Sequence, residues 1–77
     1  MWFFDSPKIF KTHEQIRKAL FLITSLDQKQ KEIVYEALAG ELDDNGVSAE
    51  EIKRVVRELR AKGLISEIDK ASLLKLI

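Results

Sequence analysis

At 77 residues the chain has room for one small domain with a single core, and its Lys and Arg residues balance its Asp and Glu residues. The absence of cysteine excludes disulfides, thiolate chemistry and cysteine-based zinc sites. No apolar run approaches the roughly 20 residues of a membrane-spanning helix, and the apolar start at Met1–Phe4 is too short for a signal peptide. We therefore predict a cytoplasmic protein without a membrane partner.

The first eleven residues are predicted to form an extended N-terminal arm rather than a helix. They hold four of the six aromatic residues: Trp2, Phe3, Phe4 and Phe10. Pro7 favours an extended conformation at Ser6. The arm can close the core as a lid, or it can expose an aromatic patch that docks on a partner or a second copy.

Four helices follow the arm, and their bounds are predicted mainly from end signals: residues 12–25, 27–42, 48–62 and 66–77. Two helix starts carry capping boxes, in which Ser or Thr precedes Glu or Gln by three residues: Thr12–Gln15 and Ser48–Glu51. The second helix is capped by Ser25 or Asp27, and the fourth begins at Ser66. Gly63 ends the third helix as a left-handed cap residue.

The arrangement of these helices follows from their short connections, which make consecutive helices neighbours in space. No segment shows the alternation of a half-buried strand, and we find no internal repeat. The sequence therefore predicts the all-α class, with residues 1–77 forming one small four-helix bundle of orthogonal or irregular packing. The extended aromatic arm precedes this bundle.

The charges are unevenly distributed along the chain. Residues 32–51 contain seven acids and no base, whereas residues 52–62 contain five bases and one acid. These segments can face each other inside the domain or form an exposed separation of charge. The lack of an overall basic excess argues against a non-specific nucleic-acid binder.

Residues suited to catalysis are sparse. The single histidine, His13, lies in the first turn of a helix, where the helix dipole disfavours its charged form. The sequence contains neither a nucleophile elbow nor a glycine-rich phosphate loop. We predict that the protein is not an enzyme and that it holds no cofactor.

The acidic stretch before the third helix is the strongest candidate for a cation site. Glu41, Asp43, Asn45 and Gly46 place oxygen ligands at alternating positions before a glycine, and the stretch resembles the calcium loop of the EF-hand family. One residue fewer separates Gly46 from the next helix than in that family, which puts the closing glutamate out of step. A helix–loop–helix connection without a metal is the prediction, and cation binding by residues 43–46 stays open.

The third helix carries bases that could contact nucleic acid: Lys53, Arg54, Arg57 and Arg60. Residues 59–65 resemble the end of the recognition helix in winged-helix proteins, and with Lys70, Leu73 and Leu74 they resemble the SAP nucleic-acid module. Both resemblances imply nucleic-acid binding through this basic face. A further helix, rather than a β-wing, is expected after Ile65.

The preferred function is a non-catalytic interaction module that binds a protein partner or a second copy of itself. Apolar residues in excess of what a small bundle can bury lie at both chain ends, and we predict the interaction residues as Trp2, Phe3, Phe4, Leu73, Leu76 and Ile77. The alternative is a nucleic-acid-binding helical module that uses the basic face of the third helix.

Overall fold

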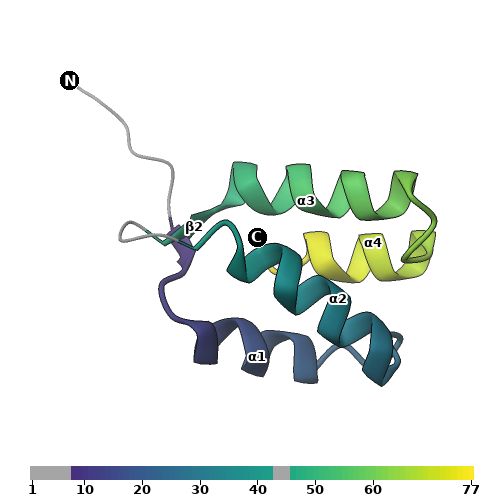
Figure 1. Cartoon of the computed structure of the whole chain (residues 1–77), viewed down its shortest axis with the longest axis horizontal. Helices are drawn as coiled ribbons and strands as arrows, with labels where there is room; N and C mark the ends of the chain where they lie inside the picture. The colour runs from purple at the N-terminus through teal and green to yellow at the C-terminus, as the bar shows by residue number, and fades with distance from the viewer. Residues whose placement is uncertain (1–7, 43–45) are drawn as a thin grey trace.

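The computed structural model describes residues 8–42 and 46–77, and within them the chain is mostly helical (Figure 1). The elements are, in chain order, β1 (Lys8–Phe10), α1 (His13–Phe21), α2 (Gln28–Ala39), β2 (Val47–Ser48), α3 (Ala49–Ala61) and α4 (Glu67–Leu74). The prediction of a mainly helical fold is confirmed. Within the described ranges, no helix has the length and apolar character needed to cross a bilayer.

The two short strands are a correction to the sequence prediction. β1 and β2 pair antiparallel, with Lys8 opposite Ser48 and Phe10 opposite Val47. Strands of two or three residues cannot show an alternating pattern, and their pairing joins segments far apart in the sequence. Phe10 and Val47 are both buried, so the end of the predicted arm belongs to the core. Residues 1–7, which include Trp2, Phe3 and Phe4, lie outside the described residues.

The helix starts follow the predicted caps. The side chains of Thr12, Asp27, Ser48 and Ser66 each accept a hydrogen bond from the third backbone amide of the helix that follows. The boxes at Asp27, Ser48 and Ser66 are complete, whereas Gln15 accepts a hydrogen bond from the backbone amide of Lys11 instead of that of Thr12.

The helices are shorter than predicted at their C-terminal ends. α1 stops at Phe21 because residues 22–26 tighten into turns, with Ile23 donating to the carbonyl of Leu20 and Leu26 to that of Ile23. These turns bury Ile23 and Leu26 and leave Phe21 exposed. Gly63, at φ +75°, ends α3 as predicted: its amide donates to Arg60, and the Leu64 amide donates to Leu59, at 3.0 Å each.

The helices form two hairpins that share one core. α1 packs on α2 and α3 packs on α4, while α2 and α3 join the hairpins (Figure 1). The fully buried apolar side chains come from every helix and from β2: Ile16, Val34, Leu38, Val47, Ile52, Val56 and Leu73. In each hairpin, the two helices also form a surface that lies outside this shared core.

Candidate functional site

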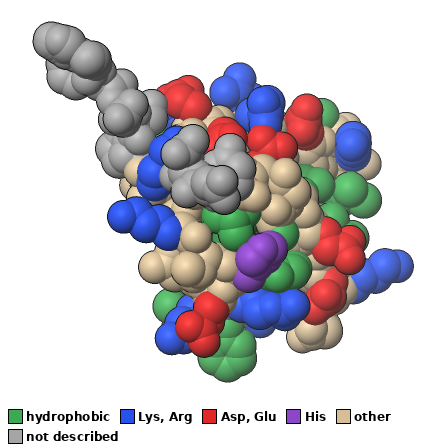
Figure 2. Space-filling view, turned by 60° about the vertical axis from the view of Figure 1, so that its left-hand side comes forward, with side chains coloured by type: hydrophobic (Ala, Val, Ile, Leu, Met, Phe, Trp, Pro, Cys, Tyr) green, Lys and Arg blue, Asp and Glu red, His purple; other side chains and the backbone are tan. Residues whose placement is uncertain are grey.

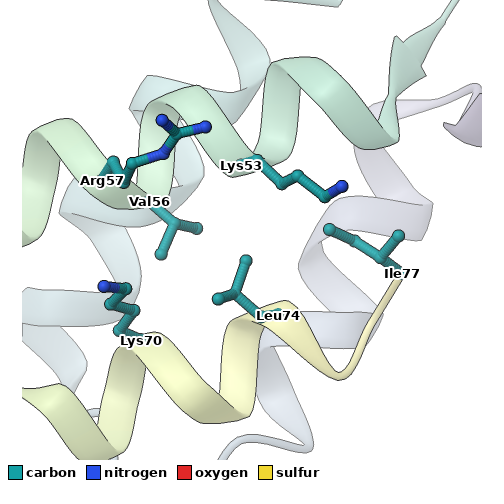
Figure 3. Close-up of a pocket in the computed structure, with 6 residues that line it drawn as sticks. All are labelled: Lys53, Val56, Arg57, Lys70, Leu74 and Ile77. Carbon is teal, nitrogen blue, oxygen red and sulfur yellow. The ribbon is translucent and has the colours of Figure 1, made fainter.

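A groove lies between α3 and α4 in the described part of the chain (Figure 3). Its volume is about 320 Å³, and its lining residues are Lys53, Val56, Arg57, Lys70, Leu74 and Ile77. Figure 3 shows Val56 and Leu74 pointing toward each other across the space between the helices. We call this recess the α3–α4 groove.

Helical spacing explains why these residues meet. Positions 56 and 57 follow position 53 by three and four residues, so both lie beside it on one face of α3. Positions 70 and 74 have the same relation on α4, and the turn from Leu74 to Ile77 keeps residue 77 on that side. The packing of α3 on α4 then brings the two faces together.

The groove has a basic rim and an apolar floor. Lys53 and Arg57 stand on α3 and Lys70 stands on α4, and none of the six lining residues is acidic. Val56 is buried, whereas Leu74 is half-buried and Ile77 is 42% exposed. A ligand in this groove would therefore meet two accessible aliphatic side chains surrounded by three cations.

The predicted basic face of α3 is divided by the structure. Lys53 and Arg57 line the α3–α4 groove, and Lys53 Nζ lies 3.6 Å from the exposed Glu50 carboxylate. Arg54 is instead hydrogen-bonded to Glu41, which follows α2. The acidic segment therefore faces the basic segment at this point.

Arg60 is also engaged by an acid, since its Nε donates to the Glu67 carboxylate on α4 at 2.9 Å. Two of the four predicted nucleic-acid contacts, Arg54 and Arg60, are thus held by ion pairs to other segments. The four bases do not form one uninterrupted cationic surface.

The predicted apolar interaction surface is also divided. The prediction that Leu73 belongs to a docking surface is wrong, because this side chain is fully buried. It lies on the side of α4 that faces the other helices. Leu76 is half-buried, and Ile77 contributes to the groove. Among the described residues, the most exposed large apolar side chains are instead Phe21, Leu22 and Ile68, which are 70–77% exposed.

Of the candidate oxygen ligands and the single histidine, Glu41 and His13 lie in the described residues. Within residues 8–42 and 46–77 no cluster of three or more His, Asp or Glu side chains could hold a metal ion. Asp43 and Asn45 lie outside these ranges, and the Glu41 carboxylate accepts a hydrogen bond from Arg54. His13 lies with its Nδ1 3.0 Å from the Tyr35 hydroxyl, on a face where basic and acidic side chains are mixed (Figure 2).

Asp69 is the one buried carboxylate among the described residues, and the sequence analysis did not single it out. Its Oδ1 accepts a hydrogen bond from the Ser25 hydroxyl at 2.6 Å, and its Oδ2 accepts one from the Ser66 amide at 3.0 Å. Burial raises the pKa of Asp69, but these hydrogen bonds outweigh it, so the pKa lies below the ordinary value of 3.8. The residue is a structural link between α4 and the turn after α1.

Replacing Ser25 by alanine tests this link. Hydrogen bonds to a charged group contribute more than neutral ones, so S25A should lose roughly 1–2 kcal/mol of unfolding free energy at pH 7. Because folding lowers the pKa of Asp69, this stabilisation is present above pH 3.8 and is lost as the pH falls through the folded-state value. Urea unfolding at pH 7 and pH 3 should therefore show a smaller difference between wild type and S25A in acid.

Aspartate 69 itself provides the control for that measurement. D69N removes the titrating group, so its stability should decline less steeply than that of wild type between pH 5 and acid. An S25A effect of equal size at both pH values would contradict the role assigned to the ionised carboxylate.

Similarity to known proteins does not add to this geometry. No protein-family model, curated protein or solved structure matches the chain.

Proposed function

We propose that the domain is a non-catalytic protein-interaction module whose α3–α4 groove binds an acidic amphipathic segment of a partner protein. The observation that carries this proposal is the union of a basic rim, Lys53, Arg57 and Lys70, with an accessible apolar floor at Leu74 and Ile77. Glutamate or aspartate side chains complement the rim, and aliphatic side chains complement the floor.

The size of the groove supports a short peptide element as its occupant. A volume of about 320 Å³ lies at the lower end of the roughly 300–1,000 Å³ typical of ligand sites, which suits a few side chains. Each well-buried apolar anchor contributes about 1.5–3 kcal/mol, and each exposed ion pair contributes about 0.2–1 kcal/mol. After the entropy cost of association, these terms predict weak, reversible binding.

A protein segment fits this surface better than nucleic acid does. A phosphate backbone would match the cations but would leave Leu74 and Ile77 without apolar contacts. Arg54 and Arg60 would also have to leave Glu41 and Glu67 to join the contact. The formal net charge of zero provides no general attraction to a polyanion.

The test is a titration of the full chain with a synthetic helix-forming peptide of about 16 residues, followed by amide chemical shifts. The peptide carries leucines three and four positions apart, flanked by glutamates, and its control carries lysines in place of the glutamates. We expect saturable shifts for residues 53–57 and 70–77 with the acidic peptide. The lysine peptide should cause none.

Charge-reversal variants locate the interaction. K70E replaces an attraction with a repulsion and should weaken binding roughly 3- to 30-fold. K11E, a reversal at an exposed position outside the groove, should stay within about twofold of wild type. Equal losses in both variants would indicate non-specific attraction, and tighter binding of a short DNA duplex than of the acidic peptide would favour the nucleic-acid alternative.

A further inference from the structure

The two hairpins share one order of elements, a structural correspondence that the sequence analysis did not predict. The first half (residues 8–39) and the second half (residues 46–77) each run strand, helix, helix. Residues 12–25 correspond to residues 48–61, and residues 26–38 correspond to residues 65–77. Between these matched segments the second half has three additional residues, 62–64, at the turn between its helices.

Helix caps fall at corresponding positions of the two halves. Each capping residue and its third helical position has a counterpart: Thr12 with Ser48, Gln15 with Glu51, Asp27 with Ser66, and Gln30 with Asp69. The strands that begin the two halves pair antiparallel, which is consistent with a local twofold relation between the halves.

The core repeats the same correspondence. Five pairs of matched positions are buried on both sides: Ile16 and Ile52, Leu20 and Val56, Ile23 and Leu59, Leu26 and Ile65, and Val34 and Leu73. This agreement indicates that corresponding helices of the two hairpins bury corresponding faces. A surface feature of one hairpin therefore has a defined counterpart on the other.

The counterpart of the α3–α4 groove is a second recess, between α1 and α2, with a volume of about 220 Å³. We call it the α1–α2 groove. Five positions line both recesses at matched places: Arg17 with Lys53, Leu20 with Val56, Phe21 with Arg57, Lys31 with Lys70, and Tyr35 with Leu74. A base on the first helix and a lysine on the second are thus present in both.

We propose that the α1–α2 groove is a second binding site for an acidic amphipathic segment, which makes the domain bivalent. This inference rests on the proposed function of the α3–α4 groove. Arg17 and Lys31 supply the cations, and the 74% exposed ring of Phe21 supplies the apolar contact. Glu32 also lines this recess and opposes an acidic ligand, and an aromatic replaces one cation of the other rim. The second site is therefore the weaker of the two.

Aromatic rings hold both cations of this second site in place. The Arg17 guanidinium lies 4.1 Å from the centre of the Tyr35 ring, and Lys31 Nζ lies 5.4 Å from the centre of the Phe21 ring. A partner carboxylate can approach either cation while an apolar side chain rests against Phe21. The second site therefore prefers segments in which acidic residues adjoin large apolar ones.

The experiment is the same amide-shift titration of the full chain, carried to saturation with the acidic peptide. We expect two groups of shifts, one at residues 53–57 and 70–77 and a weaker one at residues 17–21 and 28–35. K70E should weaken the peptide affinity reported by the first group of shifts and leave the affinity reported by the second group unchanged. R17E/K31E should weaken only the affinity reported by the second group. K11E should alter neither group by more than about twofold.

A tandem peptide adds a readout of bivalency. The tandem peptide holds two acidic segments joined by a linker of about 20 Gly and Ser residues. The average end-to-end distance of this linker is roughly 25 Å, and the longest dimension of the domain is 41 Å. The tandem should bind at least about tenfold more tightly than one segment, and either groove variant should abolish that gain.

The outcomes separate the two proposals. Shifts confined to the α3–α4 groove, with no gain from the tandem peptide, would overturn the second site and leave the proposed function standing. An absence of saturable shifts at both grooves would overturn both.

Discussion

Gly46→Ala should lose about 3 kcal/mol or more of unfolding free energy, the largest effect we expect from adding a single methyl group. Gly46 has φ +88°, a conformation that costs an L-residue about 1–2 kcal/mol. A Cβ atom there would also lie 2.6 Å from the carbonyl oxygen of Phe10. The clash involves backbone, so its relief requires β1 to move away from β2 and takes the buried Phe10 ring with it.

Gly63→Ala is the matched control, because it isolates the cost of backbone conformation from the cost of the clash. Gly63 has φ +75°, but a Cβ atom there would meet no atom within 4 Å beyond its two neighbours in the chain. We expect a loss of about 1–2 kcal/mol from conformation alone. Urea unfolding of the two variants measures the difference, and equal losses would show that β1 yields to the methyl group without cost.

Leu73→Ala should lose about 2–5 kcal/mol, the range for removal of a fully buried leucine side chain. The loss combines the missing apolar burial with the cavity left where α4 meets the other helices. Urea unfolding measures the change, and the matched control is Ile77→Ala. Ile77 is 42% exposed at the edge of the α3–α4 groove, so its truncation should change stability by well under half as much.

The same pair of variants separates core from surface. Ile77→Ala should weaken binding of the acidic peptide, whereas Leu73→Ala should unfold more easily without a specific loss of affinity at temperatures where it is folded. If Leu73→Ala retained wild-type stability and lost only binding, the placement of Leu73 in the core would be wrong.

Local signals accounted for most of the helical part of the fold. A helix cap depends on residues within one turn, so it can be recognised from the neighbouring sequence. This applies to Thr12, Asp27, Ser48 and Ser66. The C-terminal ends were less predictable: α1 stops at Phe21 because turn residues are held by burial of Ile23 and Leu26, which is a tertiary effect. The β1–β2 pair likewise depends on contacts between distant segments.

The candidate groove was only half predictable for a similar reason. Lys53, Arg57 and Ile77 were singled out, but for two different surfaces, because one sequence pattern does not show which helix faces pack together. Lys70 was missed as a groove residue. Its four-residue spacing from Leu74 matches the pattern of α3, and aligning the two halves would have paired it with Lys31.

Two hydrogen bonds connect the turn of each hairpin to a helix of the other hairpin, and they affect local unfolding of the domain. Asp69 on α4 holds the turn between α1 and α2, while Gln30, its counterpart on α2, donates to the carbonyl of Leu64 in the turn between α3 and α4, at 3.4 Å. The strands join the halves at the other end of the molecule (Figure 1). Each hairpin is thus linked to the other at both ends, which favours opening of the two hairpins together. Native-state hydrogen exchange should accordingly report one common opening free energy for the buried amides of all four helices.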